Sequence, residues 1–295
     1  MDYYLIGELS INGALVGLMY SLVALGIVLI YKASRYANLA QGAFAMTGGY
    51  LCVVLAQMLG LPMWLAVPLS AGMLFLLGML VERLMLRRMI GQPIIMVIML
   101  TLGLEILLRG LIPGSMGSAV RKLDLGIPQQ PLFIGEMLIN RAYLVGGLVA
   151  LALIAAAILF FNSRVGVRMR AVSDDQIASW SVGIRVERVI AVAWGLAGLA
   201  AAAAGILWGS VQGVDWTLSL LLLKGLAIAI LGGLDSIGGV LIAGLIIGIA
   251  ESLAAGYLDT LVGGGTRDVV ASVIILLTVL VRPHGLFGRE HIERV

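Results

Sequence analysis

The stretch NGALVGLMYSLVALGIVLIY, residues 12–31, decides the fold class, because it runs for twenty positions without a charged side chain. A helix that crosses a hydrocarbon core of about 30 Å needs roughly 20 mostly apolar residues at 1.5 Å each. Apolar runs such as LIAAAILFF (153–161) and VLIAGLIIGIA (240–250) recur along the 295-residue chain. They lack the alternating pattern of a transmembrane β-barrel. The sequence therefore predicts an all-α, polytopic integral membrane protein.

The composition points to the same class. Hydrophobic residues make up 61% of the chain and charged residues 12%, whereas soluble domains carry roughly 45–50% and about 25%. This argues against a soluble globular enzyme. The formal net charge of +3 does not indicate nucleic acid as a partner, because membrane orientation accounts for the basic residues. Cys52 is the only cysteine, so an intramolecular disulfide is impossible and we expect no cysteine-based zinc site.

Hydropathy and charge breaks divide the chain into nine candidate spans, within a range of about eight to ten. The spans are 9–31, 38–59, 62–86, 94–112, 142–161, 189–212, 218–233, 238–258 and 265–281. Two of them are irregular: 38–59 begins with polar Asn38 and Gln41, and 218–233 is short and ends at a pair of glycines. We expect either of these two to be re-entrant or broken.

The basic residues are distributed unevenly over the two sets of loops. One set holds thirteen of the nineteen: Lys32, Arg35, Arg83, Arg87, Arg88, Arg164, Arg168, Arg170, Arg185, Arg188, Arg282, Arg289 and Arg294. The other set holds four, namely Arg121, Lys122, Arg141 and Arg267. Since basic residues in short loops stay on the cytoplasmic side, we predict an outer N-terminus and a cytoplasmic C-terminus. An odd number of crossings follows, and nine fits.

Two loops of this single transmembrane domain, residues 1–295, are longer than turns. The outer loop 113–141 holds three prolines and no helical period, and we expect it to cap the outer mouth. The cytoplasmic loop 162–188 contains a pattern for a short helix that begins at Ser173, with Gln176 completing a capping box. Gly183 provides its stop. From the residues alone, this helix lies either on the membrane surface or against a cytoplasmic partner.

Three segments resemble the permeases of branched-chain amino-acid ABC importers. The first is Gly166 to Ile206, containing RMRAVSDDQIASWSVGIRVERVIA; the second is 12–31 followed by NLAQGAFAMTGGY (38–50); the third is LGGLDSIGGVLIAGLIIGIAES (231–252). The likeness covers nearly the whole chain. The second segment is closer to the H-type subunit than to its M-type companion. In this family His is frequent at the position of Gln41 and an acidic residue at that of Ala43, so the solute can differ from leucine, isoleucine or valine.

The resemblance implies a permease subunit in a bacterial inner membrane, with the N-terminus periplasmic. Its implied partners are a homologous second permease, two cytoplasmic ATP-binding subunits and a periplasmic solute-binding protein. The short helix in 162–188 is then the coupling helix that contacts an ATPase. The coupling residues would be Arg170, Ser173, Asp174, Asp175, Ala178, Gly183 and Ile184.

Glycines within the spans are expected to have one of two roles. Gly13 with Gly17, and Gly244 with Gly248, form G-x-x-x-G pairs, and we expect these to pack helix against helix. Other glycines interrupt spans, namely Gly42, Gly48 and Gly49 in one place and Gly232, Gly233, Gly238 and Gly239 in the other. The segments that open at Asn38 and Asp235 form a weak internal repeat. Interrupted spans in two halves of a transporter commonly mark the solute site.

Polar residues inside spans complete the candidate pathway, because a central charge costs about 2.5–3.5 kcal/mol on insertion scales. Glu105 and Arg109, four residues apart, are expected to form an ion pair on one helix face. Lys224 is expected to snorkel to the interface, and Glu251 to face either the subunit interface or the pathway. The candidate pathway residues are Asn12, Tyr20, Asn38, Gln41, Gly42, Thr47, Gly49, Glu105, Arg109 and Glu251.

Chemistry that the sequence lacks narrows the function further. No G-x-x-x-x-G-K-[ST] loop is present, so ATP hydrolysis is expected on separate subunits. His284 and His291 fall in the tail without metalloprotease spacing, and no G-x-S-x-G elbow appears. We therefore expect no catalysis, no cofactor and no metal. The alternatives are a stand-alone secondary carrier or channel, an importer of urea, short amides or other amino acids, and, least supported, a membrane scaffold.

Overall fold

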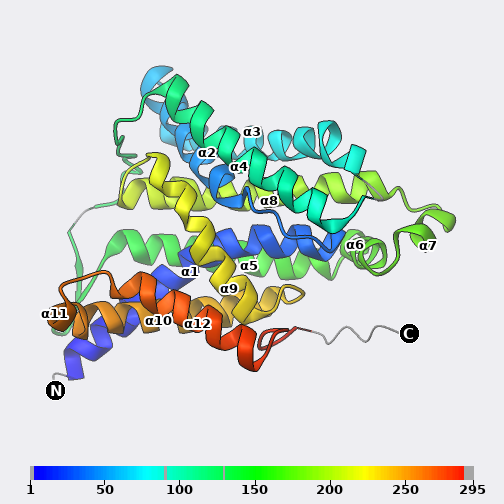
Figure 1. The fold of residues 1–295 in the computed structure, drawn as a ribbon. Coiled ribbons are helices and arrows are strands. Elements are labelled where there is room, and N and C mark those ends of the chain that lie inside the picture. Colours follow the sequence, from blue (N-terminus) through cyan, green and yellow to red (C-terminus); the bar gives the residue numbers. More distant parts are fainter. Residues whose placement is uncertain (1–2, 90–91, 129, 289–295) are drawn as a thin grey trace.

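In the computed structural model, described over residues 3–89, 92–128 and 130–288, the chain forms a bundle of long helices (Figure 1). Nine helical passes in these residues follow one another in alternating directions. They are α1 (Tyr3–Ser34), α2 (Gln41–Val53) with a π-helical turn (Val54–Met58), α3 (Met63–Leu84), α4 (Ile94–Met116), α5 (Arg141–Phe161), α8 (Val186–Val211), a 3₁₀ helix (Trp216–Leu220) with α9 (Leu221–Gly232), α10 (Ile237–Tyr257) and α12 (Thr266–Val281). Shorter elements lie between them: a 3₁₀ turn (Leu86–Met89), strands β1 (Leu132–Ile134) and β2 (Met137–Ile139), α6 (Arg164–Asp174), α7 (Gln176–Ser181) and α11 (Asp259–Val262).

Each of the nine segments predicted as a span overlaps one of these passes, so the all-α membrane fold is confirmed. Six of the helices, α1, α3, α4, α5, α8 and α10, are long and apolar enough to cross a membrane. The two segments expected to be irregular are broken: α2 changes into a π-helical turn, and a 3₁₀ helix precedes α9. α12 has 16 residues and would reach about 24 Å at 1.5 Å per residue.

The basic residues gather at one end of the bundle, the end that carries α6 and α7 (Figure 1). Arg289 and Arg294 lie outside the described residues, and the other eleven of the thirteen lie in helix ends or connections there. We call this end the basic end. The opposite end, with the N-terminus of α1, the β1–β2 strands and α11, is called the hairpin end. Which end faces the cytoplasm remains a prediction.

Helix α1 is the centre of the bundle. It packs against α5, α8, α9 and α10, and residues 17–30 are buried without interruption. Its contact with α10 is made by the two G-x-x-x-G pairs, as predicted. A Cβ atom on Gly13 would lie 2.6 Å from the carbonyl oxygen of Gly248, and one on Gly248 would lie 2.5 Å from the Cα of Gly17. Side chains at these positions would therefore force the two backbones apart.

The loop 113–141 departs from the prediction in two ways. α4 continues to Met116, because the carbonyl of Pro113 still accepts a hydrogen bond from the amide of Gly117, at 2.8 Å. Residues 132–139 form an antiparallel hairpin in which Phe133 is paired with Leu138. Strands of three residues carry too few alternating positions for a pattern to identify them.

We expect Gly248→Ala to destabilise the protein and Gly238→Ala, in the same helix, to leave it unchanged or slightly more stable. A methyl group on Gly248 meets the α1 backbone, whereas nothing lies within 4 Å of one on Gly238. Overpacking of this kind costs about 1–3 kcal/mol. Unfolding of the two purified variants in a mixed-micelle SDS titration measures the difference, and equal midpoints would contradict the close α1–α10 contact.

Candidate functional site

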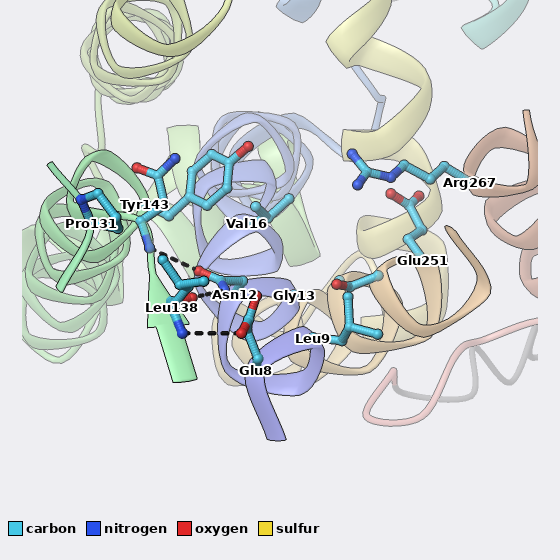
Figure 2. Close-up of a pocket in the computed structure, with 13 residues that line it drawn as sticks. Glu8, Leu9, Asn12, Gly13, Val16, Pro131, Leu138, Tyr143, Glu251 and Arg267 are labelled. Atoms are coloured by element: carbon cyan, nitrogen blue, oxygen red, sulfur yellow. Dashed lines mark hydrogen bonds between the residues drawn. The ribbon is translucent and has the colours of Figure 1, made fainter. Parts of the chain in front are cut away.

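A polar cavity of about 410 Å³ opens at the hairpin end, between α1, α5, α10, α12 and the hairpin (Figure 2). Its size falls in the range of small-molecule sites. Polar and charged side chains from four helices line it together with a few apolar ones. They include Glu8, Leu9, Asn12, Val16, Leu138, Asn140, Tyr143, Glu251, Ser252 and Arg267. Of the predicted pathway residues, the fold thus brings Asn12 and Glu251 to one cavity.

The hairpin is fixed to α1 by two polar side chains of that helix. The Asn12 Nδ2 donates to the carbonyl of Leu138 at 2.8 Å, and its Oδ1 accepts from the amide of Asn140 at 3.1 Å. One turn earlier, a carboxylate oxygen of Glu8 accepts from the amide of Leu138 at 3.0 Å (Figure 2). Asn12 therefore lines the cavity, but both ends of its amide are bonded to the hairpin. Glu8 was not among the residues predicted from the sequence.

A partly buried ion cluster lies beside this cavity. The Lys224 Nζ of α9 is 2.7 Å from Glu251 Oε1 of α10 and 2.9 Å from Asp268 Oδ1 of α12. The side chains of Lys224 and Glu251 are only 13% and 3% exposed, whereas that of Asp268 is 85% exposed. The expectation that Lys224 snorkels to the interface is wrong. The cause is tertiary packing, since both partners lie on other helices.

The predicted pathway residues of α2 are buried in helix contacts. The Gln41 Nε2 donates to the carbonyl of Ala197 in α8 at 2.9 Å, and Asn38 Nδ2 donates to Gln41 Oε1 at 3.2 Å. The hydroxyl of Thr47 donates to a carbonyl of its own helix at 2.7 Å. These bonds satisfy polar groups inside the bundle, and a pathway role for them stays a prediction.

The glycines and the tyrosine in the predicted set also lie in close packing. A Cβ on Gly42 would collide with the carbonyl oxygen of Ser219, and one on Gly49 would lie 3.1 Å from that of Gly205. Tyr20 stacks on Trp208, with ring centroids 4.7 Å apart.

On α4, the predicted ion pair forms, with Arg109 Nε 3.4 Å from Glu105 Oε1. Arg109 is 40% exposed on the outside of the bundle.

The loop 162–188 forms two helices where one was expected. α6 contains Ser173, and the N-cap of α7 is Asp175, whose Oδ1 accepts from the amides of Ile177 and Ala178 at 2.9 Å each. The predicted cap at Ser173 is therefore wrong by two residues. The Asp175 carboxylate accepts hydrogen bonds from two amides at the start of α7. Ser173 lies inside α6 instead, and its backbone carbonyl accepts a hydrogen bond from Arg35.

The end of α7 is as predicted. Gly183 follows the helix with a φ of +84°, and its amide donates to the carbonyl of Trp180 at 3.0 Å. Ile184 packs back on the core. Arg170 connects α6 to the end of α5, because its Nη1 donates to the carbonyl of Phe161 at 2.8 Å. Three large apolar side chains of α7 and its C-terminus point away from the bundle: Ile177 (81% exposed), Trp180 (66%) and Val182 (74%).

One residue at the basic end, missed by the sequence reasoning, connects α1, the α6–α7 junction and the start of α10. Arg35 follows α1 and has a φ of +63°, which is rare for a residue with a Cβ. Its Nη1 lies 3.1 Å from both carboxylate oxygens of Asp235, and its Nη2 lies 3.1 Å from Asp174 Oδ1. Its Nε donates to the carbonyl of Ser173. No local pattern reveals this cluster, because the partners of Arg35 lie 138 to 200 residues away from it in the chain.

The fold and the sites together define a polytopic membrane protein with a polar cavity at one end and a capped, exposed helix at the other. Residues 9–281 match the model of a family described as "Branched-chain amino acid transport system / permease component". The chain belongs to this family of ABC permeases. As a permease component, it is not itself an enzyme.

Two sequence relatives agree with the family assignment. The chain is similar to the high-affinity branched-chain amino acid transport system permease protein LivH of Escherichia coli (strain K12), with 30% identity over 96% of each chain. It is also similar to the LivM permease of the same kind of system in Salmonella typhimurium, with 25% identity over 96% of this chain and 71% of the relative. Among solved structures, PsaBC from Streptococcus pneumoniae in complex with Fab is similar over 96% of this chain and 94% of the other, with 15% identity and a TM-score of 0.47.

Removing Lys224 should destabilise the protein strongly, because Lys224→Met leaves Glu251 buried without its cation. Breaking one partner of a buried pair costs about 3–5 kcal/mol. Removing the exposed partner, in Asp268→Asn, should cost less than about 1 kcal/mol. The double variant K224M/E251Q should recover most of the loss, as measured by SDS titration. A K224M protein as stable as wild type would show that the cluster contributes nothing.

Proposed function

We propose that this chain is one of two permease subunits in an ATP-driven importer that carries branched-chain amino acids, or related small polar solutes, into a bacterial cytoplasm. The observation that carries the proposal is α7. Asp175 caps it, Gly183 ends it, and Ile177, Trp180 and Val182 are exposed beyond the bundle. Exposed apolar side chains on a rigid, capped helix fit the groove of a partner protein. In this proposal the partner is one of two cytoplasmic ATPases.

Two points support the proposed assembly. The relatives LivH and LivM are both named as permease proteins of a high-affinity branched-chain amino acid transport system, which supports a pair of homologous permeases. The basic end carries eleven of the described basic residues, and this supports a cytoplasmic position for α7 and for the C-terminus. The hairpin end then faces the periplasm, where a solute-binding protein delivers the solute.

The cavity at the hairpin end has the chemistry to receive an amino acid. Arg267 can hold an α-carboxylate, and Glu8 can accept from an α-ammonium group, since both line this cavity. Leu9, Val16 and Leu138 provide apolar surface for an aliphatic side chain. Urea or a short amide would use the same polar groups without the apolar ones. Binding of radiolabelled leucine, urea and acetamide to the cognate binding protein separates these solutes.

Arg35 is the residue through which we expect motion of α7 to reach the membrane helices. It holds the α6–α7 junction through Asp174 and the start of α10 through Asp235, and it follows directly on α1. A displacement of α7 by the ATPase would therefore pull on α1 and α10 together. Their close glycine contact makes them move as one unit.

The second candidate function is a stand-alone carrier driven by an ion gradient. The buried pair of Lys224 and Glu251, which the exposed Asp268 extends, favours it, because buried titratable groups serve as proton relays in such carriers. A carrier has no use for an exposed, capped helix at its cytoplasmic end. Solute uptake by proteoliposomes that contain this chain but no ATPase would establish the carrier and refute the importer.

Trp180→Ala should weaken binding of the ATPase by about 30-fold or more, since a buried tryptophan at an interface commonly contributes 2 kcal/mol or more. Trp64→Ala is the matched control, because Trp64 is similarly exposed (74% against 66%) but lies in the first turn of α3 at the hairpin end. The measurement is retention of the ATPase by the affinity-purified permease. If both variants retain it equally, α7 is not the docking element.

Arg35→Gln should lower the number of solutes transported per ATP hydrolysed while leaving the assembled complex and its basal ATPase activity intact. Arg35→Lys should restore part of the coupling, because lysine keeps the charge but loses the bidentate fork. Arg88→Gln, an exposed arginine at the same end, is the control. Parallel assays of uptake and phosphate release in proteoliposomes give the ratio, and an unchanged ratio in R35Q would rule out this relay.

A further inference from the structure

A groove of about 780 Å³ runs along the outside of the bundle where α3 faces α8, near the basic end. Its walls are mostly apolar, and its charged residues are confined to one end. The lining residues are Met73, Leu76, Leu77, Met79, Leu80, Glu82, Arg83, Arg87, Arg188, Ala191 and Val192. The cavity at the hairpin end and α7 share none of them.

The apolar part of the groove has the length of one acyl chain. Met73, Leu76 and Leu80 are 41%, 64% and 49% exposed, at helical spacing on one side of α3. From Met73 to Arg83 the helix rises about 15 Å, which is half of a hydrocarbon core of about 30 Å. The apolar part of the groove is therefore long enough to follow an acyl chain through one leaflet. Small residues of α8, Ala191 and Val192, leave the space open on the other wall.

The charged end carries a net positive charge. Arg83, Arg87 and Arg188 all line it, against a single lining acid, Glu82. Glu82 is buried and lies 3.5 Å from Arg87, which it neutralises. Arg83 and Arg188 form no ion pair within the described residues. Two guanidinium groups at this end of the groove thus remain for an anion, and Glu187 is the one acidic residue of α8.

We propose that this groove binds one acidic phospholipid of the cytoplasmic leaflet, with its phosphate at Arg83 and Arg188 and an acyl chain along Met73, Leu76 and Leu80. The leaflet rests on the orientation proposed above, but the site does not depend on the solute or on the ATPase. Basic pockets between membrane helices on the cytoplasmic side are suited to anionic headgroups. A helix of a second permease would cover the apolar wall and leave both arginines without an anion.

The test uses a fluorophore at Leu80. The full-length chain carries C52A and L80C, so that position 80 holds the single cysteine, and it is reconstituted with its copurifying subunits into phosphatidylcholine vesicles. Nitroxide-labelled phosphatidylglycerol should quench the fluorophore with an association constant at least about fivefold above that of nitroxide-labelled phosphatidylcholine, since each basic residue near an acidic lipid contributes about 1 kcal/mol. The preference should vanish in R83Q/R188Q and persist in R164Q/R168Q, which removes two α6 arginines at the same end.

Three outcomes would overturn the proposal: equal quenching by the two lipids, a preference that survives in R83Q/R188Q, or a fluorophore that neither lipid quenches because another subunit covers it. Should R83Q/R188Q fail to assemble, the same labelled protein is measured in 1 M salt, where the Debye length falls to about 3 Å. Loss of the phosphatidylglycerol preference there supports the arginine site, and an unchanged preference refutes it. None of these readouts requires transport, so they stand apart from the proposed function.

Discussion

The contact between the glycine faces of α1 and α10 holds the bundle together. Lipid removes the hydrophobic drive between helices, so that association depends on close packing and on polar contacts between them. Gly13, Gly17, Gly244 and Gly248 allow the two backbones to approach until a single Cβ atom would collide. Around this pair α5, α8 and α9 also pack on α1, and α2 and α3 pack in turn on α8.

Because α1 has 32 residues, it extends about 48 Å and reaches both ends of the molecule. At the hairpin end Glu8 and Asn12 hold the wall of the polar cavity. At the basic end Arg35 holds the α6–α7 junction and the start of α10. One rigid helix therefore connects the cavity proposed to receive solute with the helix proposed to receive the ATPase. Coupling between the two ends therefore does not depend on successive rearrangements of side chains along the bundle.

The few charges inside the bundle follow one rule, that a buried charge must be paired. Glu105 and Arg109 meet this rule within one helix turn, and spacing alone predicted the pair. Lys224, Glu251 and Asp268 meet it across three helices, and the sequence reasoning assigned Lys224 to the interface instead. The difference is one of range: a four-residue spacing brings two side chains together in any helix, whereas a contact between helices depends on how they pack.

The sequence by itself determined the all-α membrane fold, the position of the nine helical segments, the two broken ones and the G-x-x-x-G pairs, because length, hydropathy and small-residue spacing act locally. It also placed a capped helix before Gly183, although the cap is Asp175 and not Ser173. Only the tertiary structure decided that Gln41 bonds α8, that Glu8 and Arg267 line one cavity, and that Arg35 meets Asp174 and Asp235. Those groups are far apart in the chain, and only the packing of the helices brings them together.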